Sequence, residues 1–168
     1  MLKITSRMNI LFAALMALAA GCQAESRYST PTADDIPRLI QDLKEGDEMS
    51  RAHAAEALSY LGPDAKTALP ALLLGLRDEA EQVRQNVLHA IIAIGPDATA
   101  IQPLTDSLKD SDHLVRALSA NALGQLGSSA RPSIPALREA LQDRDPNVQK
   151  EAADALRAIS ASQKHVAN

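Results

Sequence analysis

The chain has 168 residues, of which 46% are hydrophobic and 2% are aromatic. This composition excludes a disordered chain and suits one domain large enough to bury a continuous core, built from Ala, Leu, Ile and Val rather than aromatic rings. The formal net charge is -4, and it falls to -6 without the first 21 residues, which hold Lys3 and Arg7 and no acidic residue. A nucleic-acid partner is therefore not expected, because phosphate binding needs a basic face.

Residues 1–21 have the features of a signal peptide. Two basic residues precede the apolar run "ILFAALMALAA", which is well under the roughly 20 residues that a membrane-spanning helix needs. The segment ends in "AGC", at Ala20 to Cys22. This end resembles the lipobox of bacterial lipoproteins, a likeness that implies cleavage before Cys22 and attachment of lipid, such as palmitate, to that Cys.

The alternative for this segment is a soluble exported protein cleaved after Ala19. Cleavage there would leave Cys22, the only Cys in the chain, as a lone thiol in an oxidising compartment. Residues 22–32 have no apolar periodicity and are expected to form a flexible tether. Because Gln23 rather than Asp follows the Cys, the lipoprotein resemblance implies transport to an outer membrane, facing the periplasm.

A repeat of 32 or 33 residues governs the chain from about residue 33. Its unit boundaries fall at about 33–65, 66–98, 99–130 and 131–161, and residues 162–168 form a tail. Two columns of Leu mark the copies: Leu39, Leu72, Leu104 and Leu137, then Leu43, Leu76, Leu108 and Leu141. A recurrence of this length is typical of stacked structural units.

Each unit is predicted to be a helical hairpin, because two patterns of helical spacing flank a short polar break. Side chains that cap helix starts lie before the first helix, and a Pro falls in its first turn; these residues are Asp34, Thr67, Thr99 and Ser133, and Pro37, Pro70, Pro103 and Pro135. The second helix is expected to end at a Gly in a left-handed turn, at Gly62, Gly95 and Gly127.

One stripe of the second helices repeats from unit to unit and is predicted to be the core side. It consists of Ala54, Ala57, Leu58 and Leu61; Val87, Ala90, Ile91 and Ile94; Ser119, Ala122, Leu123 and Leu126; and Ala152, Ala155, Leu156 and Ile159. One hairpin cannot bury such a stripe alone, but four stacked hairpins can.

The segments "RDEAEQVRQNVLHAIIAIG" and "KDSDHLVRALSANALGQLG" resemble the short HEAT-like repeats grouped with phycobilisome lyases. The resemblance covers residues 33 to about 161 and implies an all-α fold, a right-handed α-solenoid of four hairpins. It says little about activity, because such repeats serve scaffolds, lyases, hydroxylases and binding proteins alike. The fourth copy departs from the pattern at Gln149 and Ser160, as an end unit is expected to do.

Arg51, Arg84 and Arg116 recur at one position of the repeat. They are interpreted as a structural ladder that pairs with acids of the hairpin turns and holds adjacent units in register. The candidate partners are Asp47, Asp78, Asp110 and Asp112. The other interpretation is a basic ladder for an anionic ligand.

No catalytic residues, metal site or cofactor are predicted. The four His occupy unrelated repeat positions, and although His53 and Glu56 are three residues apart, that spacing also fits ordinary exposed polarity. No Ser or Cys stands in a nucleophile motif, and no glycine-rich phosphate loop is present. A bilin lyase role gains little support from a chain with so few aromatic residues and no spare Cys.

The stripe beside the core stripe varies from unit to unit, and by the HEAT-like resemblance it would line one continuous concave groove with few positive charges. We expect a protein or peptide partner to bind there, the alternative being a merely solvated helix face. The candidate residues are His53, Glu56, Tyr60, Asn86, His89, Asn121, Gln125, Glu151 and Asp154.

The sequence therefore favours a membrane-anchored lipoprotein, monomeric and without enzymatic activity, that acts as an interaction or scaffold module. The alternative is an enzyme accessory or degenerate lyase-type protein that binds a small ligand.

Overall fold

The computed structural model describes residues 30–161. The predicted signal peptide, Cys22, most of the tether and the tail at 162–168 lie outside these residues. By its internal contacts the chain divides into two units, with the boundary between Thr30 and Pro31, and the fold below is that of the second unit.

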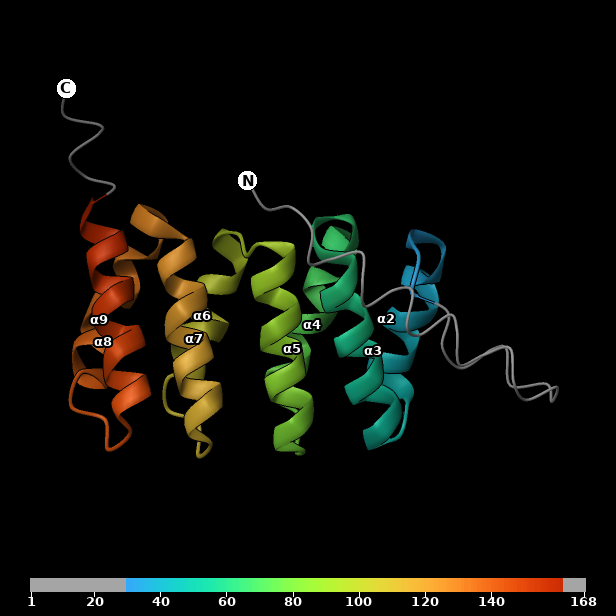
Figure 1. Ribbon diagram of the computed structural model, residues 1–168, viewed down its shortest axis with the longest axis horizontal. Helices are drawn as coiled ribbons and strands as arrows, with labels where there is room; N and C mark the ends of the chain where they lie inside the picture. Colours follow the sequence, from blue (N-terminus) through green and yellow to red (C-terminus); the bar gives the residue numbers. More distant parts are fainter. Residues whose placement is uncertain (1–29, 162–168) are drawn as a thin grey trace, which may run out of the picture. The chain divides into compact units, whose positions relative to one another are not determined.

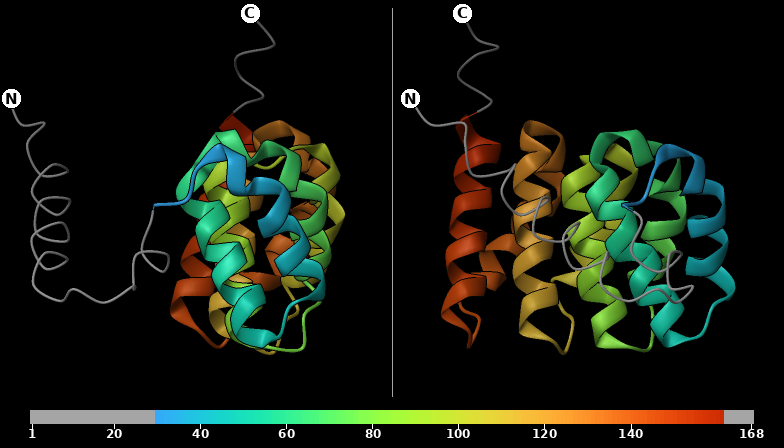
Figure 2. Two further views of the ribbon diagram at one scale, coloured as in Figure 1. Left: turned by 90° about the vertical axis from the view of Figure 1, so that its right-hand side faces the viewer. Right: turned by 45° about the vertical axis from the view of Figure 1, so that its right-hand side comes forward.

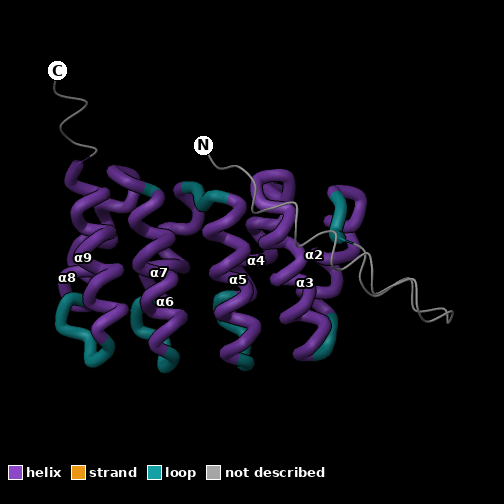
Figure 3. Tube along the Cα trace, viewed as in Figure 1, coloured by secondary structure: helices purple, strands orange, loops and turns teal. Residues whose placement is uncertain are grey.

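Within residues 30–161 every regular element is helical (Figure 3). Four hairpins follow one another, each with a first and a second α-helix, as predicted. The hairpins are α2 (Ile36–Glu45) with α3 (Glu48–Leu61), α4 (Leu69–Gly75) with α5 (Glu81–Ile94), α6 (Ile101–Ser107) with α7 (His113–Gln125), and α8 (Ile134–Ala140) with α9 (Pro146–Ala161).

The hairpins stack side by side into an α-solenoid. The second helices α3, α5, α7 and α9 stand in one row, and the first helices form a row behind them (Figure 1). Seen along the stack, the two rows are two layers (Figure 2). In the described part of the chain, no helix has both the length and the apolar character needed to cross a membrane.

The connections into the first helices differ from the predicted side-chain caps. The chain enters through 3-10 segments at Ala33–Asp35, Gly62–Ala68, Ala98–Ala100 and Gly127–Ser133, and no side chain caps α2, α4, α6 or α8. The predicted caps were therefore wrong. A 3-10 turn that runs directly into an α-helix satisfies the first free N–H groups of the α-helix with backbone carbonyls. Where a side chain caps this entry, as Asp97 does by accepting the N–H of Thr99, it caps the 3-10 segment and not the α-helix.

The glycine turns are as predicted. Gly62, Gly95 and Gly127 have φ of 54°, 84° and 52°, a region that residues with a Cβ rarely adopt. The fourth unit has Ser160 at this position, and α9 continues through it to Ala161.

The predicted core stripe lies between the two layers. Leu58, Ile91, Leu123 and Ile159, one from each second helix, are completely buried. Four members of the stripe, Ala57, Leu61, Leu126 and Leu156, are only half-buried and pack against the edge of the core. Ser119 is the one polar member of the stripe, and its hydroxyl donates to the carbonyl of Val115 at 2.7 Å.

A ladder of ion pairs joins each unit to the next. The guanidinium of an Arg near the start of the second helix binds both carboxylate oxygens of an Asp in the following unit, and it also donates to backbone carbonyls of its own hairpin turn. The pairs, with their shortest N–O distances, are Arg51–Asp78 at 2.6 Å, Arg84–Asp110 at 2.9 Å and Arg116–Asp143 at 2.7 Å.

Two of the acids named as ladder partners have another role. Asp47 and Asp112 are N-caps of α3 and α7, where their carboxylates accept the N–H groups of Ser50 and Val115. The third partner of the ladder, Asp143, was not among the candidates. The turns of units 3 and 4 thus carry two acidic positions, one that caps the helix and one that pairs with the previous unit, whereas the N-cap of α5 is Ala80, which has no capping side chain.

At each end of the stack, a different residue replaces the Arg or the Asp of the ladder, so the series of ion pairs ends there. Unit 1 has Glu45 where later units have the pairing Asp, and no unit precedes it among the described residues. Unit 4 has Gln149 where earlier units have Arg. The Gln149 amide donates to the carbonyl of Asp143 at 2.6 Å, which preserves the bond to the turn without placing a guanidinium where no Asp follows.

The spacing between second helices is uneven. α7 and α9 lie closer together than α5 and α7 (Figure 1). Gly124 faces α9 so closely that a Cβ there would stand 3.1 Å from the Cα of Ala155. At the matching repeat position, α5 carries the half-buried side chain of Ile92 toward the next unit. A bulky residue at one junction and a missing Cβ at another account for the difference.

Candidate functional site

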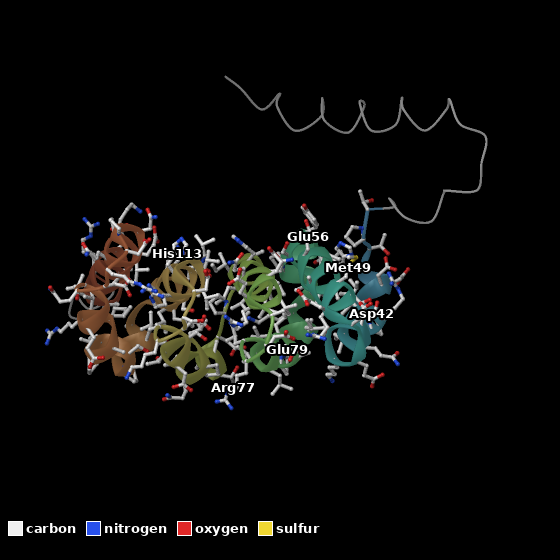
Figure 4. The ribbon with its side chains drawn as sticks, turned by 90° about the horizontal axis from the view of Figure 1, so that it is seen from below. Asp42, Met49, Glu56, Arg77, Glu79 and His113 are labelled. Carbon is white, nitrogen blue, oxygen red and sulfur yellow. The ribbon has the colours of Figure 1, made fainter. Side chains whose placement is uncertain are left out.

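The nine predicted partner-binding residues all lie on the second helices, and the surface they form is called here the second-helix face. Met49, Glu56 and His113 lie along this side of the stack, and Arg77 and Glu79 lie on the opposite side (Figure 4). Five of the nine are exposed, namely His53, Glu56, Tyr60, His89 and Gln125; four are half-buried, namely Asn86, Asn121, Glu151 and Asp154.

Two amide side chains on this face join neighbouring units. Asn86 donates from Nδ2 to the carbonyl of Ala52 on α3, at 3.0 Å. Asn121 donates from Nδ2 to the Glu151 carboxylate on α9, also at 3.0 Å. Because both amides already form hydrogen bonds within the stack, they have fewer free hydrogen-bonding groups for a partner than their exposed area suggests.

The α9 end of the face carries its own positive charges. Lys150 binds Glu151 at 2.8 Å and Asp154 at 3.3 Å, and Arg157 also pairs with Asp154. The hydrogen bond from Lys150, and then the one from Asn121, lowers the pKa of Glu151. The acids of α9 are therefore compensated locally, and the expectation of few positive charges fails at this end.

The α3 end differs because an open groove of about 670 Å³ lies between α3 and α5. This α3–α5 groove is lined by Asp47, Glu48, Met49, Ala52, His53, Glu56, Gln82 and Asn86. Three carboxylates line it, and no Lys or Arg does. The α3–α5 part of the second-helix face thus differs in charge from the α9 end.

Met49 is a member of this site that the sequence analysis did not include. Its side chain is 67% exposed, one helical turn before His53 on the same face. The signal was available, because the column one turn earlier also varies between units, as Met49, Gln82, Leu114 and Asn147. Extending the variable stripe by one turn would have found it.

The His residues do not form a metal cluster in the described chain. Within residues 30–161, no group of three or more His, Cys, Asp and Glu side chains is arranged to hold an ion. His53 and Glu56 line the α3–α5 groove, whereas His113 contacts Asp112 at 3.6 Å near the start of α7.

Comparison with solved structures places the chain among helical solenoids. It is similar to an engineered protein (Northeast Structural Genomics Consortium target OR329), with TM-score 0.64, 24% identity and coverage of 76% of this chain and 63% of that one. A second engineered protein, target OR497, matches with TM-score 0.61, 24% identity and coverage of 74% and 37%. The chain thus spans less than two thirds of either engineered protein.

The complex of CpcE and CpcF of phycocyanin lyase from Nostoc sp. PCC7120 is also similar, with TM-score 0.58, 24% identity and coverage of 77% of this chain and 81% of that one. No curated protein matches the sequence. The family model for HEAT repeats matches residues 36–124 and 101–167, which together span most of the chain. This match and the stacked helical hairpins identify the chain as a member of the HEAT-repeat family.

Proposed function

We propose that this chain is a membrane-anchored lipoprotein whose HEAT repeats bind a protein or peptide partner through the second-helix face, without catalysis of their own. Lipid on Cys22 holds the protein at the outer membrane, and the array faces the periplasm. The residues between Cys22 and the first hairpin give the array room to reach a partner.

One observation carries the binding role. The buried positions of the second helices repeat between units, whereas the exposed positions differ in charge, size and polarity from one unit to the next. HEAT-repeat folds are extended binding surfaces, and partners typically dock along the helices that line them.

The alternative role as an accessory of a lyase-type enzyme draws on the likeness to the CpcE and CpcF complex. At 24% identity that likeness supports the fold alone. Tyr60 is the only aromatic residue between residues 30 and 161, so the described face has little with which to stack a planar pigment. Protein binding is therefore the stronger proposal.

The anchor is tested by changing Cys22 to Ser in the full chain. We expect the variant to leave the membrane fraction while its helical circular dichroism and melting temperature match those of the parent, because the Cys lies outside the repeats. A variant that still sediments with membranes after a high-salt wash would refute lipid anchoring.

The binding face is tested by site-specific photo-crosslinking in the cells that make the protein. A photoreactive amino acid replaces His89, which is exposed on α5, or Gln102, which is exposed on α6 in the other layer. We expect covalent adducts with another protein from position 89 and not from position 102. Adducts from 102 alone, or from neither position, would contradict binding through the second-helix face.

A further inference from the structure

The α3 side of the second-helix face has a concentration of exposed apolar surface. Met49 and Tyr60 are 67% and 73% exposed, and both lie on α3. With His53 and Glu56 between them, they follow helical spacing and so share one face of the helix. Each side chain is large, and neither is covered by another part of the described chain.

The exposure of Tyr60 is unusual for this chain. It is the only aromatic residue in residues 30–161, and it lies on the surface although the core is otherwise built of aliphatic side chains. Its hydroxyl reaches Glu56 only weakly, at 3.4 Å. Tyrosine and methionine are enriched where protein partners dock, because they bury much apolar area on binding.

The wall of the same groove is negative, although Asp47 also caps α3 through the N–H of Ser50 and Arg51 attracts both Asp47 and Glu48. Asp47, Glu48 and Glu56 line the groove without a neighbouring Lys or Arg in its wall. The nearest guanidinium, that of Arg51, is held by both carboxylate oxygens of Asp78 at 2.6 and 2.9 Å. On α9, by contrast, Lys150 pairs with the acids of that helix.

We propose that the α3–α5 groove binds a basic segment of a protein partner, a stretch rich in Lys and Arg that places one apolar side chain against Met49 and a second against Tyr60, about 16 Å further along α3. This inference rests on the proposed binding function and specifies its chemistry. The carboxylates attract the segment and orient it, and the apolar contact supplies the part of the affinity that salt does not screen. An acidic segment is repelled from the same site.

The charge requirement is tested with a short fluorescent peptide of Lys and Ala that carries two Leu five positions apart, a spacing of about 16 Å in an extended chain, and with its counterpart in which Glu replaces Lys. The double variant Glu48→Gln, Glu56→Gln is compared with the control Asp64→Asn, Glu139→Gln, which removes the same charge away from the groove. We expect the groove variant to weaken binding of the basic peptide roughly tenfold, and the control to change it less than about twofold.

The apolar requirement uses the double variant Met49→Gln, Tyr60→Gln. This variant should weaken binding of the peptide that contains Leu several-fold. It should leave the affinity for a Lys and Ala peptide without Leu nearly unchanged. Equal loss for both peptides would remove the apolar contact from the proposal. Equal loss in the groove and control charge variants would show diffuse attraction to the whole protein, and comparable binding of the Glu peptide would overturn the proposal altogether.

A final comparison separates this inference from the proposed function. The full-length anchored protein with a photoreactive residue at position 89 is made with and without the Glu48→Gln, Glu56→Gln change. If the parent forms an adduct and the groove variant forms it equally well, the binding function stands and the basic-segment inference fails. If the parent forms none, the proposed function fails first. Loss of the adduct in the groove variant, with retention in the Asp64→Asn, Glu139→Gln control, supports both.

Discussion

Replacing Arg116 tests whether the ladder of ion pairs holds the units together. Its guanidinium donates to the two carboxylate oxygens of Asp143 at 2.7 and 2.8 Å, and to the carbonyls of Asp110 and Ser111 at 2.9 and 3.0 Å. The Arg116 side chain is 7% exposed. Its removal would strand a carboxylate and two carbonyls where water has little access.

The expected magnitude follows from this geometry. Breaking a buried ion pair from one side costs about 3–5 kcal/mol. Asp143 is 13% exposed and still accepts the N–H of Asp145 at 2.9 Å, so we expect Arg116→Ala to cost about 3 kcal/mol, the lower end of that range. Arg116→Gln should cost about 1 kcal/mol less, because the Gln149 arrangement shows that an amide at this position reaches a turn carbonyl.

A double-mutant cycle isolates the pair itself. Arg116→Ala combined with Asp143→Asn should cost less than the sum of the single changes, with a coupling of about 1.5–3 kcal/mol for a charge-assisted, two-point interaction. The matched control is Arg38→Ala, whose side chain is 66% exposed and whose two ion pairs lie within α2 and its approach. It should change stability by less than about 1 kcal/mol.

The assay is urea unfolding of the purified protein, followed by far-ultraviolet circular dichroism and compared at constant m-value. A coupling below about 0.5 kcal/mol, or a cost for Arg116→Ala no larger than that for Arg38→Ala, would refute the conclusion that the ladder stabilises the stack.

The remaining predictions concern the core, the pH dependence and the close approach of α7 to α9. Leu123→Ala empties a completely buried site and should cost about 2–5 kcal/mol, and an unchanged melting temperature would contradict its core position. The hydrogen bond from Arg116 lowers the pKa of Asp143 from 3.8, so the stabilisation by this carboxylate is present above that value and is lost as pH falls through the lower folded-state pKa. The change Asp143→Asn should therefore flatten the loss of stability between about pH 5 and 2. An unchanged loss of stability over this acidic range would count against the prediction. Gly124→Ala should lower the stability by about 1 kcal/mol despite its better helix propensity, because the new Cβ meets the backbone at Ala155; a gain in urea midpoint would show that α9 can move away freely.

The hairpin architecture was predictable because its signals are local and recur. A buried leucine column, a glycine that adopts positive φ and a polar break each determine the structure of a few residues. Because the pattern occurs in four copies, a departure in one copy does not obscure the prediction. The capping prediction failed for a local reason as well. Ser133, for example, precedes α8 as a capping residue would, but it lies at the end of a 3-10 segment, and its hydroxyl contacts Thr105 at 2.6 Å instead.

The binding face was less predictable, because its chemistry depends on contacts between units. Sequence columns identify which residues share the face. They do not reveal that Asn86 reaches the backbone of the previous unit or that Lys150 neutralises the acids beside it. The same limitation applied to the ladder, where spacing alone did not distinguish Asp112, which caps a helix, from Asp143, which pairs with Arg116.

The substitutions that end the ladder also bear on self-assembly. In a stack of like units, the outer surface of the last unit resembles the internal surfaces on which units stack, so it could pack against the first unit of another copy. Such head-to-tail contacts do not close and can grow into filaments. If the last unit of one copy met the first unit of another, Gln149 would face Glu45 in place of Arg facing Asp. The added junction would lack the bidentate ion pair that every internal junction has. Two residues, one at each end, thus disfavour polymerisation while leaving the internal stacking surfaces unchanged.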